Sequence, residues 1–134
     1  MTNADRVREF HETFGVPVGV QPVARIDSHY MRVGLLQEEF DEYKAAVEAD
    51  DVVEVADAIA DMLYVLYGTA IEHGIPIDAV FAEVHRSNMT KADENGTPYR
   101  RDDGKIIKGP RFEPPMIARL LNPEESMHSK RDAR

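Results

Sequence analysis

Three acidic residues lie on a stretch that is otherwise almost entirely apolar, residues 54–71. On a helix that advances by about 100° per residue, Glu54, Asp57 and Asp61 fall within an arc of about 60°. Nearly every other direction around that helix carries Val, Ala, Ile, Met, Leu or Tyr, which is typical of a buried helix. Because burying carboxylates is costly unless a positive group pairs with them, this pattern predicts a cation-binding site.

A second acidic block, residues 38–42, precedes that helix. From the start of this block to Asp61 the chain contains ten acidic residues and a single basic one. Two antiparallel helices joined by a tight turn would bring Glu39 and Glu42 opposite Asp57 and Asp61. Such a cluster suits Mg²⁺ or Mn²⁺ rather than Zn²⁺. Since Mg²⁺ is usually completed by waters and substrate phosphates, the pattern favours phosphate-ester chemistry.

The acidic residues have two alternative interpretations. A solvated helix face is the better interpretation for Glu48, Asp50 and Asp51. A di-iron carboxylate bundle would need two Glu-x-x-His pairs on facing helices. The sequence contains one such spacing, Glu125–His128, so this alternative is weak.

Helix signals dominate the first two thirds of the chain. The predicted helices end near Phe14, Ala49, His73 and Lys91, with expected N-caps at Asn3 or Asp5, Asp27 or Ser28, Asp50 or Asp51, and Asp78. The predicted fold is therefore all-α, a single domain over residues 1–134 with a four-helix core at about 26–91 and an irregular C-terminal arm at about 92–134. Within the arm, Tyr99–Arg101 and Lys105–Ile107 predict a short β-hairpin across an Asp-Gly turn, and Ala118–Leu121 a further helical turn. The last dozen residues are expected to be frayed.

Composition restricts the class of partner. The net charge of −9 argues against binding to a nucleic-acid polymer. However, 11 of the 16 Lys and Arg residues follow position 84, which suits a substrate that brings both metal and phosphate. Cysteine is absent, and no stretch resembles a signal peptide or a membrane span. We therefore expect a cytoplasmic protein that does not associate with membranes.

A second group of polar residues, 85–91, lies at the end of the fourth predicted helix. Asn88 and Lys91 are one turn apart. Lysine supplies a point charge for a phosphate, and asparagine can contact a base edge or a phosphate oxygen. The alternative is that cations simply favour a helix C-terminus, and for Arg86 the two interpretations are evenly balanced.

Four motifs together resemble one family. They are Glu-Glu-x-x-Glu at 38–42, Ala-Asp-x-x-Tyr at 60–64, His-Arg-Ser-Asn-Met-Thr-Lys at 85–91 and Asp-Gly-Lys-Ile-Ile-Lys-Gly-Pro at 103–110. Over roughly residues 30–116 the chain is similar to the all-α nucleoside-triphosphate pyrophosphohydrolases, the MazG-like and phosphoribosyl-ATP pyrophosphohydrolase-like proteins. The resemblance implies a four-helix metal-binding module that forms a homodimer or a dimer of dimers.

The resemblance also implies which residues bind metal. Glu39, Glu42 and Asp61 match the family's ligands. The family commonly shows Glu-x-x-Asp ending at this aspartate, but position 58 is Ala. Asp57 and Glu54 are therefore the candidates for the fourth ligand. Because Glu54–Asp57 is itself a Glu-x-x-Asp, a second register of the family motif is also open.

The implied reaction is Mg²⁺-dependent cleavage of a nucleotide between its α- and β-phosphates, which gives a nucleoside monophosphate and pyrophosphate. Glu38 or Glu39 would position or deprotonate the attacking water, and Lys91, with Arg86 or Lys108, would hold phosphate oxygens beside Asn88. A (deoxy)nucleoside triphosphate such as dUTP is the expected substrate on family grounds. Two alternatives remain, phosphoribosyl-ATP as substrate and a non-enzymatic helical module that binds a protein partner and is held by a structural cation.

Overall fold

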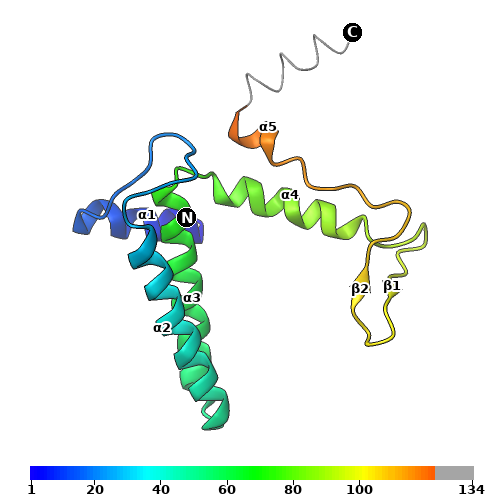
Figure 1. Ribbon diagram of the computed structural model, residues 1–134, viewed down its shortest axis with the longest axis horizontal. Helices are drawn as coiled ribbons and strands as arrows, with labels where there is room; N and C mark the ends of the chain where they lie inside the picture. Colours follow the sequence, from blue (N-terminus) through cyan, green and yellow to red (C-terminus); the bar gives the residue numbers. More distant parts are fainter. Residues whose placement is uncertain (123–134) are drawn as a thin grey trace. The chain divides into compact units, whose positions relative to one another are not determined.

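The computed structural model describes residues 1–122 and contains four main helices and one small sheet (Figure 1). In chain order the elements are α1 (Asn3–Phe14), α2 (His29–Glu48), α3 (Val52–Glu72), α4 (Ile77–Met89), β1 (Tyr99–Arg100), β2 (Ile106–Ile107) and α5 (Ala118–Leu121). The predicted all-α class with a short β-hairpin is confirmed. The chain divides into two compact units, one formed by Met1–Ile77 and one that begins at Asp78. That residues 1–134 form a single domain stays a prediction.

The helix bounds agree with the sequence more closely than the helix caps do. At α3 the predicted cap is confirmed, since the carboxylate of Asp51 accepts a hydrogen bond from the Glu54 N–H. At α1 the prediction of Asn3 or Asp5 is wrong. Thr2 is the N-cap there, and Asp5 completes a capping box by accepting from the Thr2 N–H.

At α2 the predicted cap residue is confirmed, since Ser28 is the N-cap. Its hydroxyl makes no cap hydrogen bond, however, and instead donates to the Glu72 carboxylate. The predicted cap of α4 is wrong. Asp78 lies inside the first turn of α4, which begins one residue earlier. A carboxylate in a first turn is still favourable, because it faces the positive end of the helix dipole.

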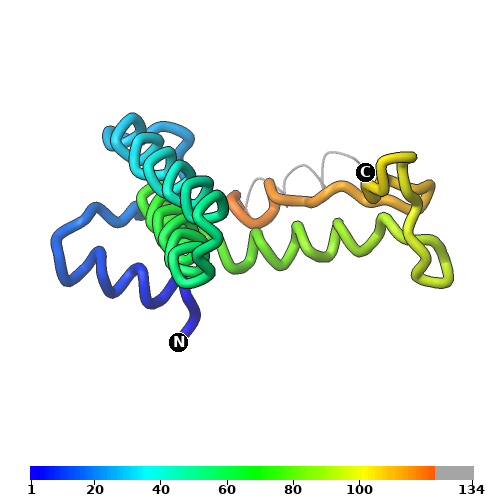
Figure 2. The backbone as a smooth tube through the Cα atoms, turned by 90° about the horizontal axis from the view of Figure 1, so that it is seen from below, coloured from blue at the N-terminus to red at the C-terminus, as the bar shows by residue number. Residues whose placement is uncertain are grey.

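Helices α2 and α3 form an antiparallel pair, which is the main structural element of the first unit. Figures 1 and 2 show the two helices side by side. The turn between them is tight, and Asp50 adopts a left-handed conformation with φ 53°, which aspartate tolerates better than most residues. Helix α1 packs against α3. The buried apolar side chains of the described residues are few and mostly small, namely Val7, Ala46, Ala58, Ala70 and Ile71.

The connector between α1 and α2 satisfies the C-terminal end of α3. The Gly19 N–H donates to the Ile71 carbonyl and the Val23 N–H to the His73 carbonyl, both at 2.9 Å. A Cβ at position 19 would lie 2.6 Å from the Glu72 carbonyl oxygen, so only glycine allows this approach. The connector thereby fixes where α2 begins relative to α3.

A buried polar network, not predicted from the sequence, holds the three helices together. Arg32 on α2 forms an ion pair with Glu72 on α3, and both residues are buried. Ser28 Oγ donates to the second carboxylate oxygen of Glu72 at 2.7 Å. His11 on α1 donates from Nδ1 to the Pro17 carbonyl at 2.9 Å, which leaves its Nε2 facing Arg32 Nη2 at 3.5 Å.

Gly68 makes room for this network, and we expect Gly68→Ala to destabilise the protein. A Cβ there would lie 2.6 Å from Arg32 Nη1 and 2.9 Å from His11 Nε2. Overpacking of this kind costs about 1–3 kcal/mol, more than the gain of up to about 1 kcal/mol from replacing a helical glycine with alanine. The measurement is urea unfolding.

Gly34→Ala is the matched control for this prediction. Gly34 is exposed on α2, and an added Cβ would have no neighbour within 4 Å. This variant should gain stability through helix propensity alone. If both alanine variants are stabilised equally, Gly68 does not have the proposed steric role.

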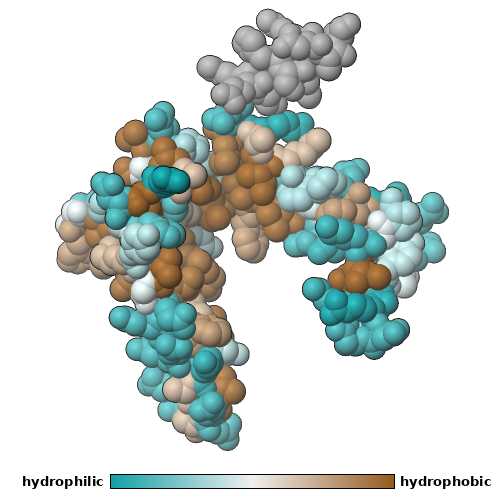
Figure 3. Space-filling view, in the orientation of Figure 1, coloured by the Kyte–Doolittle hydropathy of each residue, from teal (hydrophilic) through white to brown (hydrophobic). Residues whose placement is uncertain are grey.

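The prediction that α3 is buried almost all round is wrong for the single chain. Ile59, Leu63 and Leu66 are 43%, 48% and 48% exposed, and Val52 is 78% exposed. These four residues, called the α3 stripe below, fall within an arc of about 60° on the side of α3 opposite the acidic residues. Within the first unit, Met1–Ile77, only α1 and α2 pack on α3, so this side of α3 has no cover from that unit. Figure 3 shows brown apolar patches among the teal polar surface of the α2–α3 pair.

The second unit is organised along α4. Thr90 Oγ1 accepts from the Glu113 N–H at 2.8 Å, and Ser87 Oγ donates to the Glu113 carbonyl at 2.7 Å, so the extended segment after the hairpin is fixed to α4. The predicted hairpin is confirmed, with Tyr99 opposite Ile107, as is the short helix α5. The predicted frayed end and the Glu125–His128 spacing lie outside the described residues. No helix within residues 1–122 has the length and apolar character needed to cross a bilayer.

Candidate metal centre

Three carboxylates converge between α2 and α3. Glu39 and Glu42 lie one turn apart on α2, and Asp61 faces them from α3. Each offers an oxygen, and these oxygens all lie within 4.8 Å of one another. Within the described part of the chain this is the only set of three or more potential metal-ligating side chains. We refer to these three residues as the carboxylate cluster.

The electrostatics of the cluster show an unsatisfied negative site. Glu39 Oε2 is buried and has no hydrogen-bond partner among the described residues. Burial, followed by the charges of Asp61 and Glu42, raises the pKa of Glu39. Burial and then the carboxylates of Asp57 and Glu42 likewise raise the pKa of Asp61. Like charges held this close disfavour the ionised form, and none of the ion pairs found in residues 1–122 includes a member of the cluster.

A divalent cation fits this donor set. All the donors are carboxylate oxygens, the ligand type that Mg²⁺ and Mn²⁺ prefer. The unpartnered Glu39 oxygen is the kind of buried polar atom that calls for an explanation, and a bound ion would provide one. Glu39, Glu42 and Asp61 are therefore the residues that could hold a metal.

The remaining predicted acidic residues lie outside the cluster. Asp57 is exposed, although its charge is close enough to raise the pKa of both Glu39 and Asp61. Glu54 and Glu38 are also exposed. The expectation that Glu54 and Asp57 are withdrawn from water is thus wrong for the single chain, because α1 and α2 leave the first turns of α3 uncovered. Of the two candidates for the fourth ligand, Asp57 is the one with electrostatic contact to the cluster.

The predicted phosphate-binding residues all lie in the second unit. Arg86 is already engaged, since it contacts Glu83 and Glu113, each at 2.8 Å. The Arg86 hydrogen bond, together with the Met116 N–H, lowers the pKa of Glu83 to about 2. Arg86 therefore fixes the segment that follows the hairpin onto α4, which favours a structural role.

The other three residues of this set take part in none of the ion pairs found in residues 1–122. Lys91 follows the end of α4, one turn after the exposed Asn88. Lys108 is exposed, with Nζ 4.8 Å from the centre of the Phe112 ring. Their binding to phosphate stays a prediction.

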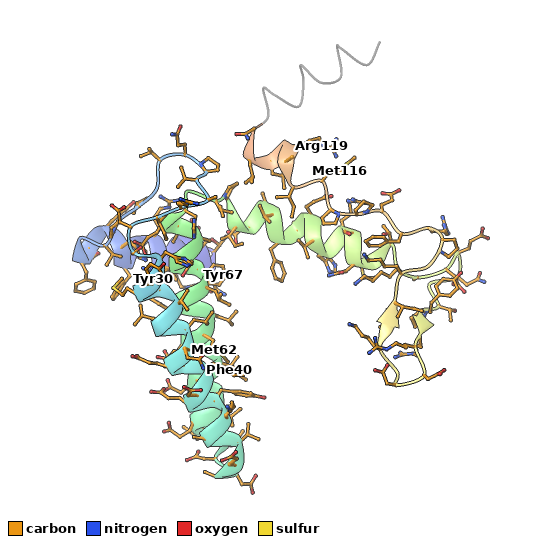
Figure 4. The ribbon with its side chains drawn as sticks, viewed as in Figure 1. Tyr30, Phe40, Met62, Tyr67, Met116 and Arg119 are labelled. Carbon is orange, nitrogen blue, oxygen red and sulfur yellow. The ribbon has the colours of Figure 1, made fainter. Side chains whose placement is uncertain are left out.

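A cavity of about 190 Å³ opens between α1 and α3, and the sequence reasoning assigned no function to it. Its lining includes Arg6 from α1 and two tyrosines from α3, Tyr64 and Tyr67. Tyr67 is labelled in Figure 4, on the part of α3 that contacts α1. The available signal was a pair of tyrosines, three and six residues after Asp61. In the sequence pattern they instead count among the apolar residues of the helix.

Comparison with known proteins identifies the family. Residues 7–88 match the phosphoribosyl-ATP pyrophosphohydrolase family. The chain is 31% identical over 102 residues to uncharacterized protein L479 of Acanthamoeba polyphaga mimivirus, an alignment that covers 72% of this chain but only 38% of the relative. A solved structure of a candidate NTP pyrophosphohydrolase from Exiguobacterium sp. 255-15 is 23% identical, with a TM-score of 0.49 and 98% of each chain covered. The match over most of α1 to α4 shows that the chain belongs to the phosphoribosyl-ATP pyrophosphohydrolase family, the MazG-like all-α pyrophosphohydrolases.

Proposed function

We propose that this protein is a Mg²⁺-dependent pyrophosphohydrolase of the cytoplasm. It would cleave a (deoxy)nucleoside triphosphate between the α- and β-phosphates to a nucleoside monophosphate and pyrophosphate. The observation that carries the proposal is the carboxylate cluster with its buried, unpartnered Glu39 oxygen, in a chain that belongs to a pyrophosphohydrolase family. Among deoxynucleotides we expect dUTP to be a substrate.

The acidic residues would have two roles, metal binding and activation of the attacking water. Glu39, Glu42 and Asp61 would hold the ion, with Asp57 at the edge of the site. When bound, Mg²⁺ supplies charge neutralisation for the phosphates and lowers the pKa of a coordinated water. Glu38, which is exposed beside the cluster, or Glu39 itself would orient the attacking water and accept its proton.

Cations would neutralise charge that develops on the leaving pyrophosphate. Arg86 is already paired with two carboxylates. Lys91 and Lys108 are therefore more available for this role than Arg86 is. Neither step requires a covalent nucleophile.

The test is pyrophosphate release from separately assayed nucleotides. The panel contains the four common deoxynucleoside triphosphates, dUTP and phosphoribosyl-ATP, each with Mg²⁺ and with chelator. Phosphoribosyl-ATP is the second candidate substrate because the matching family carries its name. If no nucleotide yields pyrophosphate in the presence of Mg²⁺, the enzymatic proposal is wrong and a structural cation site becomes the better interpretation.

We also propose that the α3 stripe is covered by a second copy of the chain. The stripe is an apolar surface on a helix whose opposite side carries the cluster, and exposed patches of this kind commonly mark interfaces. We expect Leu66→Glu to convert a homodimer, or a dimer of dimers, into a monomer, as measured by light scattering at micromolar concentration.

Val20→Glu is the control for this prediction. Val20 is 98% exposed and lies on the connector, outside the α3 stripe, so this variant should keep the mass of the parent. A parent protein that is already monomeric would contradict the proposed assembly.

A further inference from the structure

The α1–α3 cavity combines aromatic walls with hydrogen-bond donors. Tyr64 is 42% exposed, and its ring packs perpendicular to that of Phe10, with the ring centres 5.6 Å apart and the planes at 89°. Arg6 Nη1 donates to Asn3 Oδ1 at 3.0 Å, and both side chains line the cavity. Among the ion pairs of residues 1–122, none involves Arg6. The cavity therefore presents a guanidinium that has no carboxylate partner within the described part of the chain.

The cavity lies close to the carboxylate cluster along the same helix. Tyr64 and Tyr67 follow Asp61 by three and six residues, a rise of about 4.5 and 9 Å along α3. Tyr64 is also rotated by only about 60° from Asp61. Ala60, adjacent to Asp61, is part of the cavity lining. A ligand in the cavity would thus lie one to two helical turns from a metal bound at the cluster.

The volume suits a small planar ring. About 190 Å³ corresponds to about six water molecules, at about 30 Å³ each. Aromatic side chains stack on nucleobases, and such stacking tolerates any base. The polar groups then provide the selectivity.

We propose that the α1–α3 cavity binds the base of the nucleotide whose phosphates are held at the carboxylate cluster. This inference rests on the proposed function for the placement of the phosphates. The sugar would span the interval between Asp61 and Tyr64. A nucleotide is thus the ligand that places a ring and a metal-binding phosphate chain this far apart.

The donors in the cavity favour a base with carbonyl groups. After the Arg6–Asn3 hydrogen bond is made, the remaining guanidinium N–H groups and the Asn3 amide NH₂ are donors only, whereas the hydroxyls of Tyr64 and Tyr67 can donate or accept. Uracil and thymine present two carbonyl oxygens that accept from such donors, guanine and cytosine present one, and adenine has none. The preferred substrates should therefore be dUTP and dTTP, with dATP the poorest.

The experiment compares Arg6→Met with Arg8→Met, using dUTP and dATP. Both arginines lie on α1, but only Arg6 lines the cavity. Because a hydrogen bond from a charged group is lost, we expect Arg6→Met to lower kcat/KM for dUTP by about 10- to 100-fold, mainly through KM. The kcat/KM of Arg6→Met for dATP should change by less than about 2-fold. Arg8→Met should have the same kcat/KM as the parent for both nucleotides. The Mg²⁺-induced rise in Tm should be the same in all three proteins, which shows that the cluster and the fold are intact.

A second measurement does not depend on turnover. Deoxyuridine should shift the NMR ring signals of Tyr64 and Tyr67 in the metal-free parent, and this shift should be absent in Arg6→Met. If the parent releases pyrophosphate but Arg6→Met and Arg8→Met behave alike towards both nucleotides, the base site is wrong and the proposed function stands. If no nucleotide is hydrolysed but deoxyuridine still shifts the tyrosine signals, the proposed function fails and the base site stands. If Arg6→Met changes the molecular mass in light scattering, the cavity is an interface between copies and the base site is overturned.

Discussion

Asp61→Asn should abolish Mg²⁺ binding and turnover while making the metal-free protein more stable. The substitution preserves volume and shape but removes one charge from the carboxylate cluster, whose oxygens lie within 4.8 Å of one another. With metal, a direct ligand charge is lost. Since even outer-shell partners commonly contribute 10- to 100-fold to metal affinity, we expect a loss of about 100-fold or more. The measurements are Mg²⁺ titration, pyrophosphate release, and thermal unfolding with and without chelator.

The gain in stability without metal should depend on pH. Burial, and then the carboxylates of Asp57 and Glu42, raise the pKa of Asp61 in the folded protein. A raised pKa means that the folded state retains a proton that the unfolded chain releases, so stability falls as the pH rises above about 4. The asparagine side chain of the variant does not titrate. The difference in stability between variant and parent should therefore be small near pH 4 and grow towards neutral pH.

The control is Glu48→Gln, which removes a charge from an exposed position on α2 outside the cluster. This variant should keep both Mg²⁺ affinity and turnover, and its stability should not follow the pH dependence of Asp61→Asn. An Asp61→Asn protein with full metal-induced stabilisation and normal turnover would show that α3 contributes no ligand.

The sequence predicted those features that depend on local pattern. The helical period of the apolar residues gave α2 and α3, and the Asp50–Asp51 pair marked the turn between them. Once two helices are antiparallel and joined by a tight turn, residues equally far from the turn face one another. Glu39 and Glu42 therefore had to lie near Asp57 and Asp61, and the carboxylate cluster could be predicted without a structure.

The sequence could not settle which acidic residue of α3 joins the cluster. Glu54, Asp57 and Asp61 share one side of the helix, and periodicity alone treats them alike. In the structure only Asp61 is close enough to Glu39 and Glu42 to join the cluster, because it lies level with them along the helix pair, whereas Glu54 lies about 10 Å nearer the turn. The predicted burial of the whole helix was also wrong for the single chain, since the α3 stripe is left without a cover.

The buried network between α1, α2 and α3 was beyond sequence reasoning for a different reason. Arg32 and Glu72 are separated by 40 residues, and each alone looks like an ordinary charged surface residue. Their pairing depends on the same antiparallel alignment that forms the cluster. A charged residue of opposite sign on the inner side of each helix was the available signal, and it becomes informative only when the alignment is known.

Arg32→Met should be the most destabilising of the substitutions considered. It leaves the Glu72 carboxylate buried with only the Ser28 hydroxyl as a partner. Breaking a buried ion pair by removing one member typically costs about 3–5 kcal/mol, because the remaining charge is uncompensated. The free energy of unfolding in urea measures this loss, and Arg25→Met, at an exposed position in the connector, should be nearly neutral.

The double variant Arg32→Met/Glu72→Gln separates the cost of an orphaned charge from the cost of lost packing. The introduced glutamine is neutral and still accepts the Ser28 hydrogen bond, so most of the stability lost in Arg32→Met should return. A double variant as unstable as Arg32→Met would mean instead that the arginine acts through the space it fills between Gly68 and His11. In either case the Mg²⁺-induced rise in Tm should persist wherever the protein folds, since Arg32 precedes Glu39 by about two helical turns and the network has no member in the carboxylate cluster. Urea unfolding thus reports on the buried network, which orients the helices. The Mg²⁺-induced rise in Tm reports on the carboxylate cluster, which requires an ion.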